Sequence, residues 1–416
     1  MKFEEFGLDA KIIKSIEQMG YKRPTDIQFK AIPAILKGED VLAIAQTGTG
    51  KSAAFVVPVL QLLQKKRRNK EHTGVRCIVM VPTHELALQI TEVFKQIGKY
   101  TALRFTAIYG GVDQTEQVNR LQEGTDVLIA TPGRLFDYLN QGHLKVYNAE
   151  MLILDEADHM LDLGFFKDIE DLIKYLPKNR QTLFFSATID KKIKKLAYSL
   201  VRKPIRIQIS PKNPVAKNID HSVANINMDD KRFFLERIVK ENPDKKILVF
   251  ARTKVRCERV LKAMERVEIN SVTIHSDKTQ DERNKAMTAF KSGEVKLLIA
   301  TDVSARGIDI PNVDYVVNYD IPEQPENYVH RVGRTGRGKQ KGYAVSFCSE
   351  EEIDLLTEIE KYVGQAVDVT ELDRNEYADT IDFSSETSND WKSLMRDAEV
   401  EEENYKAAKK KRRKKK

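Results

Sequence analysis

The sequence predicts an α/β fold that is built twice, as two parallel sheets with helices on both faces. The first observation is a series of six short apolar runs within residues 41–186, separated by amphipathic stretches. The second is that the series starts again after a polar segment at 210–218. Continuous apolar strands that alternate with helices are typical of parallel sheets covered on both sides.

Eleven apolar runs are expected to be strands. In the first half they are VLAIA at 41, CIVMVP at 77, FTAIY at 105, DVLIA at 126, MLILD at 151 and TLFFS at 182; in the second half they are ILVFA at 247, SVTIH at 271, KLLIA at 296, YVVNY at 315 and YAVSF at 343. A chain of 416 residues also exceeds the size at which one core keeps growing. We therefore expect a first domain at 1–209, a linker at 210–218 and a second domain at 219–367.

The last part of the chain has a different composition. From Asp368 the periodicity fades into an acidic stretch, and residues 406–416 (KAAKKKRRKKK) then carry nine basic groups and no acid. Subtracting nine from the net charge of +7 leaves −2 for residues 1–405. The tail favours polyanions such as RNA; a solubility tail or a nuclear address is the alternative. We expect residues 368–416 to be an extension of low order.

Composition excludes several classes of protein. The N-terminus has acidic residues where a signal peptide needs apolar ones, and the longest apolar run, at 53–60, is interrupted by Pro58. Cys77, Cys257 and Cys348 lack the paired spacing of a zinc site or a disulfide framework. We expect a cytoplasmic protein with no membrane partner.

The segment AQTGTGKS, which begins at Ala45, predicts a phosphate-binding loop. It follows an apolar run and precedes a helical stretch, so Gly48 and Gly50 would let backbone N–H groups surround phosphates at a helix N-terminus. Lys51 would hold the outer phosphates and Ser52 the metal. The strict pattern begins with glycine, and Ala45 departs from it.

Two acids complete the predicted site. Asp155 and Glu156 end the apolar run MLIL, and open α/β sheets gather their ligands at the carboxyl ends of strands. Asp155 suits the shell of a magnesium ion, and Glu156 suits a base that orients water. A solvated helix start with Asp158 as N-cap is the alternative, but beside the phosphate loop the pair favours an ATP and Mg²⁺ site.

The second half supplies the opposing groups. The segment HRVGRTGRG at 330–338 presents three arginines, which at this density usually meet phosphate. Arg334 and Arg337 would reach the γ-phosphate as arginine fingers do, with structural salt bridges as the alternative.

In motif order the chain resembles the DEAD-box ATP-dependent RNA helicases over residues 3–365. Besides the phosphate loop and DEAD, the resemblance rests on GYKRPTDIQ at 20–28, PTHELA at 82–87, GG at 110–111, TPGR at 131–134, SAT at 186–188, VFART at 249–253, QDER at 280–283, ATDVSARGID at 300–309 and HRVGRTGR at 330–337. It implies two tandem RecA-like domains with a cleft between them, an ATP-binding domain followed by a helicase C-terminal domain. The compact core with a basic tail looks like the bacterial members.

The resemblance implies a set of residues around the nucleotide. Gln28, with Phe6 stacking nearby, would read adenine, because an amide can donate to and accept from one base edge; otherwise it caps a turn. The implied nucleotide-binding residues are Phe6, Arg23, Gln28, Ala45, Gln46, Thr47, Gly48, Thr49, Gly50, Lys51, Ser52, Gly307 and Asp309. The implied catalytic residues are Lys51, Asp155, Glu156, His330, Arg334 and Arg337, with the metal held by Ser52 and Asp155.

The resemblance also implies RNA contacts in both domains. Backbone, hydroxyl and arginine contacts to phosphate and sugar would hold a strand without reading its sequence, and 2′-hydroxyl contacts would select RNA. The implied RNA-binding residues are Pro82, Thr83, Gly111, Thr131, Arg134, Arg252, Gln280 and Thr301. Ser186 and Thr188 would couple the nucleotide state to domain closure, unless they are only helix caps.

The predicted function is RNA-stimulated ATP hydrolysis, with ATP and Mg²⁺, coupled to closure of the two domains. Base stacking is roughly 0.6 to 2.2 kcal/mol per step, so one cycle would open only a few pairs of a short duplex, without processivity. Single strands, short duplexes and ribonucleoprotein or ribosomal particles are the expected partners. A DNA translocase and an ATP-gated RNA clamp are the alternatives; the Gln28 motif disfavours the first, and intact Glu156, Arg334 and Arg337 disfavour the second.

Three residues depart from the family pattern. His84 stands where arginine is usual, Ser276 where glycine is common, and Val332 where isoleucine is usual. Because histidine is largely neutral at pH 7, one phosphate contact is expected to be weaker. His84→Arg should then tighten RNA binding and steepen its dependence on salt by about one unit, which a salt titration of RNA affinity measures; an unchanged slope would reject it.

Overall fold

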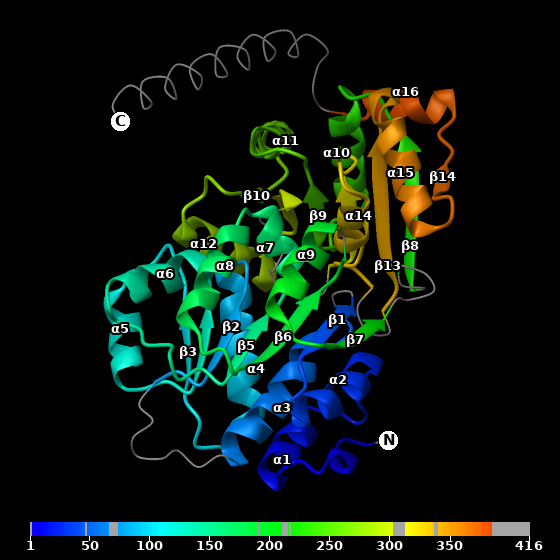
Figure 1. Ribbon diagram of the computed structural model, residues 1–416. Coiled ribbons are helices and arrows are strands. Elements are labelled where there is room, and N and C mark those ends of the chain that lie inside the picture. Colours follow the sequence, from blue (N-terminus) through cyan, green and yellow to red (C-terminus); the bar gives the residue numbers. More distant parts are fainter. Residues whose placement is uncertain are drawn as a thin grey trace. The chain divides into compact units, whose positions relative to one another are not determined.

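The computed structural model describes residues 2–45, 48–65, 74–189, 191–209, 215, 218–302, 313–336 and 340–384. The chain forms two compact units, with the main division between residues 216 and 217. Each unit is built around a single parallel sheet with helices packed on it (Figure 1). The predicted α/β class with two tandem parallel sheets is therefore confirmed.

The sheet of the first unit has seven strands in the order β3-β4-β2-β5-β6-β1-β7. The strands are β1 (Val41–Ala45), β2 (Cys77–Met80), β3 (Phe105–Ile108), β4 (Val127–Ala130), β5 (Met151–Leu154), β6 (Gln181–Ser186) and β7 (Ile205–Ile209). The first six are the six predicted strands. The seventh was not predicted as a strand, because β7 lies at the exposed sheet edge and its sequence, IRIQI, has no continuous apolar run.

Strands β3, β4, β2 and β5 end at the same level, and β6 continues past Phe184 to Ser186. Ile108, Ala130, Met80, Leu154 and Phe184 pair in register from β3 across to β6. All the pairs are parallel. The segments that follow these strands therefore leave the sheet along one edge.

Helices cover both faces of the first sheet, as the alternation of buried residues along each strand requires. Val41 and Ala43 of β1 belong to one core cluster, while Leu42 and Ile44 belong to another. The first cluster includes α1 (Ala10–Gln18), α2 (Asp26–Leu36), α3 (Lys51–Lys65) and α4 (His84–Ile97). The second includes α6 (Pro132–Asn140), α7 (Ala157–Asp162), α8 (Phe166–Tyr175) and α9 (Lys191–Leu200).

The second unit repeats this plan with the strand order β10-β11-β9-β12-β13-β8-β14. Its strands are β8 (Ile219–Asn225), β9 (Ile247–Phe250), β10 (Ser271–Ile274), β11 (Leu297–Ala300), β12 (Tyr315–Asn318), β13 (Gly342–Cys348) and β14 (Asp368–Thr370). Its helices include α10 (Lys231–Glu241), α11 (Lys254–Arg266), α12 (Gln280–Ser292), α14 (Pro325–Val332), α15 (Ile353–Val363) and α16 (Arg374–Asp382). The five predicted strands are present, and β8 and β14 were missed.

The expected start of the low-order extension at residue 368 is corrected by the structure. Strand β14 pairs with β8, and α16 packs on α10. The Tyr377 ring lies 5.0 Å from that of Phe234, and its hydroxyl donates to Asp230 Oδ2 at 2.7 Å. The segment has only a weak hydrophobic pattern, so the sequence did not predict the contacts with β8 and α10 that order it. The rest of the predicted extension, 385–416, lies outside the described residues.

All three cysteines are free and buried. Burial raises the pKa of Cys257 to about 12 and that of Cys348 to about 11, and it raises the pKa of Cys77 further. Since the thiolate is the reactive form, these side chains are structural and inert. Across the described ranges, the helices are too short or too polar to pass through a lipid bilayer.

Replacing Tyr377 should release α16 from the second unit. We expect Tyr377→Ala to speed hydrogen–deuterium exchange in peptides covering 374–384, because both the hydroxyl bond and the ring contact are lost. Tyr377→Phe keeps the ring and should have a smaller effect, since it removes only the hydroxyl's two hydrogen bonds, one to Asp230 Oδ2 and one from the Asn227 N–H, at about 1 kcal/mol each. Peptides from the first unit serve as the control, and equally fast exchange of 374–384 in the unmodified protein would contradict the ordered helix.

Candidate active site

The predicted nucleotide residues of the first unit lie where three neighbouring strands end. β1 ends at Ala45 and leads into the phosphate loop, Asp155 follows β5, and Ser186 is the last residue of β6. These strands are adjacent in the order β5-β6-β1. The structure thus brings together, on one half of the sheet edge, residues that are far apart in the sequence.

The phosphate loop leads directly into α3, whose first residue is Lys51. Gly48 and Gly50 have φ angles of 80° and 92°, a left-handed conformation that glycine adopts without strain. Lys51 is 7% exposed, and its Nζ has no hydrogen-bond partner among the described residues. Because a buried ammonium without a partner is costly, this loop fits an anionic ligand at a helix N-terminus.

Gln28 joins the start of α2 to the phosphate loop. Its Oε1 accepts a hydrogen bond from the backbone N–H of Thr25 at 3.0 Å, which completes a capping box. Its Nε2 donates to the carbonyl of Gly50 at 3.1 Å. A Cβ at position 50 would lie 2.5 Å from this nitrogen, so a side chain there would displace Gln28. The cap considered from the sequence is present, and it occurs together with a contact that the sequence did not reveal.

Asp155 and Glu156 follow β5 in contrasting environments. Burial raises the pKa of Asp155 to about 6, although nearby Lys51 lowers it. Asp155 Oδ1 accepts a hydrogen bond from the Glu156 N–H at 3.1 Å. Glu156 has a φ of 51°, which is uncommon outside glycine and often marks a functional position. Its partly exposed carboxylate lies 3.5 Å from His159 Nδ1, and His159 is a neighbour that the sequence analysis missed.

Asp158 connects these acids to the end of β6. It lies inside α7 and is not the N-cap of that helix. Its Oδ2 accepts hydrogen bonds from the backbone N–H groups of Ala187 and Thr188 at 3.1 and 3.2 Å. Thr188 N also lies 3.4 Å from Ser186 Oγ. Neither hydroxyl residue adjoins the start of α9, five residues beyond Ser186, so both belong to this bonded turn.

The predicted RNA residues of the first unit lie on the other half of the same edge. Pro82 and Thr83 follow β2, Gly111 follows β3, and Thr131 follows β4. These strands are adjacent in the order β3-β4-β2. Thr83 Oγ1 also accepts from the Leu86 N–H at 3.3 Å and so caps α4. The structure brings these four residues to neighbouring strand ends.

Arg134, also a predicted RNA contact, is buried and holds a loop. Its Nη2 donates to the carbonyl of Val112 at 3.2 Å, and its Nη1 donates to Tyr138 Oη at 3.1 Å. Since Val112 directly follows Gly111, Arg134 fixes the segment that carries the GG pair. Its contact with phosphate stays a prediction.

His84 stacks on Tyr109. The two ring centroids are 3.7 Å apart and the ring planes differ by 16°. His84 is the first residue of α4, and Tyr109 lies between β3 and the GG pair. The side chain of Gln117 bonds both backbone groups of Tyr109, at 3.0 and 3.2 Å. The stack therefore links the segment after β2 to the segment after β3. This role was not expected from the sequence, where His84 was noted only as a replacement for the usual arginine.

In the second unit, Arg252 follows β9 and belongs to a buried charge network. Its Nη2 donates to Glu352 Oε1 at 2.7 Å and to the Ile321 carbonyl at 3.2 Å. The Nζ of Lys231, which is fully buried, donates to Glu352 Oε2 at 2.5 Å. Burial lowers the pKa of Lys231, and Glu352 opposes that effect. The network fixes Arg252 at the end of β9. Its members are far apart in the sequence, so the sequence alone did not reveal it.

The arginines after α14 do not share one environment. Arg331 is buried, and its Nε and Nη2 donate to the two carboxylate oxygens of Asp302 at 2.6 and 2.7 Å. For this arginine the salt-bridge alternative is correct. Arg334 is buried just beyond the helix end, and His330 lies in its last turn.

The remaining predicted residues divide into described and undescribed ones. Thr301 follows β11, Gln280 begins α12, and Phe6 packs edge-on against Phe3 with centroids 6.2 Å apart. Arg23 is exposed, and Thr49 and Ser52 are half-buried. The residues outside the described ranges are Gln46, Thr47, Gly307, Asp309 and Arg337.

The sequence matches two protein families. Residues 25–196 match the DEAD/DEAH box helicase family, and residues 230–339 match the helicase conserved C-terminal domain. The chain is 40% identical over 361 residues to the ATP-dependent RNA helicase CshA of Limosilactobacillus reuteri, covering 87% of this chain and 72% of the relative. It is 37% identical over 370 residues to the DEAD-box ATP-dependent RNA helicase RhpA of Helicobacter pylori, covering 89% and 74%.

Solved structures share the fold. Dbp5 of S. cerevisiae bound to RNA and ADP BeF3 aligns with a TM-score of 0.80 and 29% identity, covering 92% of this chain and 98% of that one. Mss116p bound to ssRNA and AMP-PNP aligns with a TM-score of 0.80 and 30% identity, covering 94% and 83%. Dbp5 and Mss116p were thus each solved with RNA and a nucleotide analogue.

Asp155→Asn should stabilise the protein when neither nucleotide nor metal is bound. Folding raises the pKa of Asp155 from 3.8 to about 6, so the ionised form costs roughly 3 kcal/mol in the folded state at pH 8. The gain should shrink as the pH falls through 6 and be lost at about pH 3, below both pKa values, where the carboxyl is protonated whether folded or unfolded. Thermal unfolding in EDTA at several pH values measures this, and an equal gain at pH 4 and 8 would be the opposite result.

Proposed function

The chain belongs to the DEAD-box family of ATP-dependent RNA helicases, and from that premise we propose what its own residues do. It is an ATP-hydrolysing enzyme with RNA as its partner. The observation that supports the assignment of residues is the buried Nζ of Lys51 at the start of α3, which has no hydrogen-bond partner in the described part of the chain and lies on the same half of the sheet edge as Asp155. A cation that is desolvated in advance of its ligand is suited to bind phosphate.

We propose that Lys51 and the phosphate loop hold the outer phosphates of ATP. Mg²⁺ would be bound through Ser52, Asp155 and the phosphates themselves, since no group of three or more His, Cys, Asp or Glu side chains among the described residues would hold a metal alone. When bound, the ion would neutralise phosphate charge. The nearby Lys51 and such an ion both favour the ionised form of Asp155, which burial alone disfavours.

Glu156 is proposed to orient the attacking water and to accept its proton. Its left-handed backbone directs it away from the regular path of β5 into α7, and its carboxylate is partly exposed. His159 Nδ1, 3.5 Å from Glu156 Oε2, is placed to limit the orientations of that carboxylate. Arg334 is proposed to stabilise charge on the γ-phosphate, and His330 to join the water network. Asp158 is proposed to pass the nucleotide state to Ser186 and Thr188 through its bonds to that turn.

Gln28 is proposed to link base recognition to the phosphate loop. One N–H of Nε2 is used by the Gly50 carbonyl, which leaves the second N–H and a free lone pair on Oε1 for a base edge. An adenine bound there would therefore meet a side chain that already holds the loop. Guanine has a different pattern of donors and acceptors on its edge, so preference for ATP follows from the same contacts.

RNA is proposed to follow the half of the sheet edge formed by β3, β4 and β2. Gly111, Thr131 and Thr83 lie there on adjacent strands, and exposed backbone and hydroxyl groups suit contacts with phosphate and sugar. In the second unit, Thr301 and Arg252 follow the adjacent strands β11 and β9. Unwinding of short duplexes without processivity and a cytoplasmic location complete the proposal.

The first test is ATP hydrolysis with no nucleic acid, with single-stranded RNA, and with DNA of the same sequence. We expect RNA to stimulate hydrolysis, and we expect Glu156→Gln to lower kcat by at least 100-fold, as for loss of a general base. RNA binding by the variant should persist, which shows that the fold is intact. Equal stimulation by DNA would favour a translocase, and RNA binding without turnover would favour a clamp.

The second test concerns His84. If the stack with Tyr109 holds the GG segment, His84→Ala should weaken binding of single-stranded RNA by about two- to tenfold, the worth of one aromatic pair. His84→Phe keeps a flat ring and should retain affinity. ATP affinity in the absence of RNA is the control and should not change. A phenylalanine variant as weak as the alanine variant would reject the stacking role.

A further inference from the structure

The first unit carries an uncompensated basic surface away from its predicted RNA residues. Residues 174–206 contain ten lysines and arginines and one acid, in a chain whose first 405 residues have a net charge of −2. Nine of the ten are exposed: Lys174, Lys178, Lys191, Lys192, Lys194, Lys195, Arg202, Lys203 and Arg206. We call these nine residues, with Tyr175 and Tyr198, the α8–α9 face.

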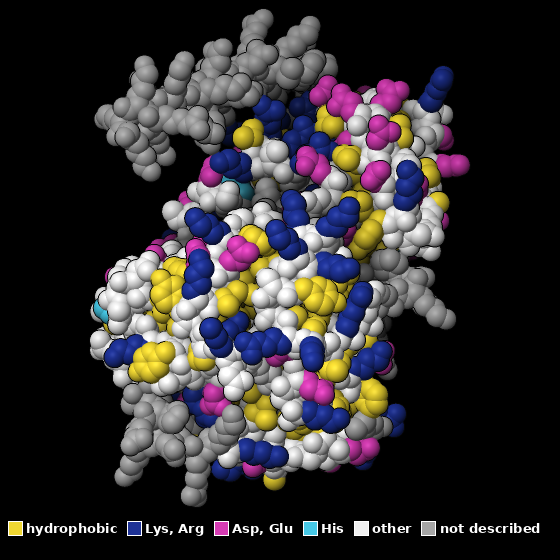
Figure 2. All heavy atoms as spheres, in the orientation of Figure 1, with side chains coloured by type: hydrophobic (Ala, Val, Ile, Leu, Met, Phe, Trp, Pro, Cys, Tyr) yellow, Lys and Arg dark blue, Asp and Glu magenta, His cyan; other side chains and the backbone are white. Residues whose placement is uncertain are grey.

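These residues gather on one side of the first sheet. Both helices bury their apolar side chains in the same core cluster, through Ile169 and Leu172 of α8 and Leu196 and Ala197 of α9. Figure 2 shows this side, with Lys and Arg side chains spread over it and few acidic ones. α9 follows β6, and β7 lies at the far edge of the sheet from β3. The α9 part of the face therefore lies away from the strand ends of β3, β4 and β2, while α8 packs on α6, where the ring of Tyr175 meets that of Phe136 edge-on at 6.5 Å.

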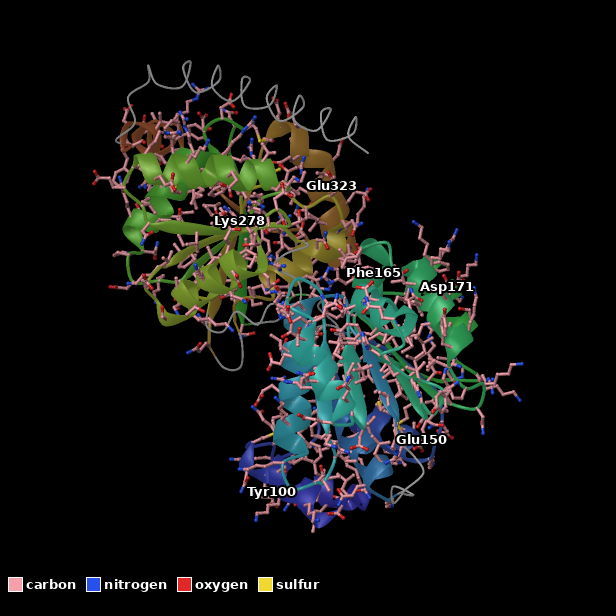
Figure 3. The ribbon with its side chains drawn as sticks, turned by 90° about the vertical axis from the view of Figure 1, so that its left-hand side faces the viewer. Tyr100, Glu150, Phe165, Asp171, Lys278 and Glu323 are labelled. Atoms are coloured by element: carbon pink, nitrogen blue, oxygen red, sulfur yellow. The ribbon has the colours of Figure 1, made fainter. Side chains whose placement is uncertain are left out.

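The positive charge is not used inside the fold. Lys174 pairs with Asp171 at 2.6 Å, and Asp171 lies at the outer surface of the first unit (Figure 3). The other eight cations of the face have no carboxylate partner within the described residues. Arg202 adds to the burial that lowers the pKa of half-buried Arg180, while Asp40 opposes that effect. Two like charges are thus held close together, with a single carboxylate acting against their repulsion.

Helix α9 is disfavoured by its own charges. Its first turn has no acidic residue and contains Lys191 and Lys192, although the helix dipole favours anions there. Lys191 is also three and four residues before Lys194 and Lys195, and like charges at this spacing destabilise a helix by a few tenths of a kcal/mol each. A solvated face would not need four lysines in this arrangement, whereas a polyanion would reverse every one of these costs.

Aromatic side chains lie among the cations. Tyr175 is 50% exposed and Tyr198 is 48% exposed. Tyr198 follows Lys194 by four residues, so the two share a side of α9. Basic groups mixed with exposed aromatic rings are typical of surfaces that bind nucleic-acid backbones and stack on unpaired bases. An acidic polypeptide would pair with the cations but would have no bases to stack on the tyrosine rings.

We propose that the α8–α9 face binds the phosphate backbone of RNA as a second site. It would hold a structured part of a long RNA, while the strand ends of β2, β3 and β4 hold a single strand. α9 has ten residues and is about 15 Å long, enough to span several phosphates of a duplex. This inference rests on the proposed RNA-binding function and adds a substrate preference, for RNA that combines a duplex with a single-stranded segment.

The test replaces Lys191, Lys192, Lys194 and Lys195 together by glutamine, which favours helices. The matched control replaces four exposed lysines on the opposite face, Lys11, Lys14, Lys37 and Lys95, in the same way. Two RNAs are compared, a single-stranded decamer and the same decamer joined to a stable 20-base-pair hairpin. Affinity is measured over a range of salt, and RNA-stimulated ATP hydrolysis is measured with both RNAs.

For the α9 variant we expect the salt slope with the hairpin RNA to fall by about two to four units, near 0.9 for each lost phosphate contact. Its KM for that RNA should rise at least tenfold, while kcat, and all values with the decamer, stay unchanged. The control variant should behave like the unmodified protein. An unchanged slope in the α9 variant, or an equal loss in the control, overturns the proposal.

Two further outcomes are decisive. If the α9 variant binds hairpin RNA normally but no longer binds polyglutamate, the face suits an acidic protein and the RNA proposal is wrong. If the unmodified protein shows no stimulation by the decamer, the proposed function itself has failed. Stimulation by the decamer in every variant, with no difference on the hairpin RNA, shows that only the second site is absent.

Discussion

The parallel register of the two sheets is the constraint on which the rest of this structure depends. Because neighbouring strands all run the same way, every motif that follows a strand reaches the same edge. The order of strands then sorts the motifs. β2 lies between β4 and β5, so Thr83 has predicted RNA residues on one side and Asp155 on the other. The predicted RNA residues and the predicted nucleotide residues therefore follow adjacent strands, even though their motifs are far apart in the chain.

Several residues at this edge lower the free energy of unfolding, and packing in the hydrophobic cores must offset that loss. Lys51 and Asp155 are both buried, and the backbone of Glu156 is in a conformation that costs about 1 kcal/mol or more. Each feature lowers the stability of the empty protein and suits it to a charged ligand. Two apolar clusters pack the faces of the same sheet, and they leave the edge free to keep such residues. The packed faces of the sheet thus supply stability, and the edge carries the residues proposed for activity.

The fold, and the position of most candidate site residues at strand ends, followed from local sequence patterns, and the exceptions have a common physical cause. Apolar runs identified β1 to β6, and glycines with a lysine identified the phosphate loop, because those signals lie within a few residues. The bond from Gln28 to Gly50, the stack of His84 on Tyr109 and the contact of Asp158 with Thr188 each join segments more than twenty residues apart. Strand β7 was missed because its sequence, IRIQI, has no continuous apolar run, and α16 because its order comes from Tyr377 and its partners.

The buried cysteines have a practical consequence. Since all three thiols are enclosed and their pKa values lie well above the physiological range, maleimide reagents will find no competing site in the folded chain. A pair of cysteines introduced at exposed positions, one in each unit, would carry fluorescent dyes without removal of the native residues. Energy transfer between those dyes would then follow the separation of the units in real time, molecule by molecule, through each turnover of ATP.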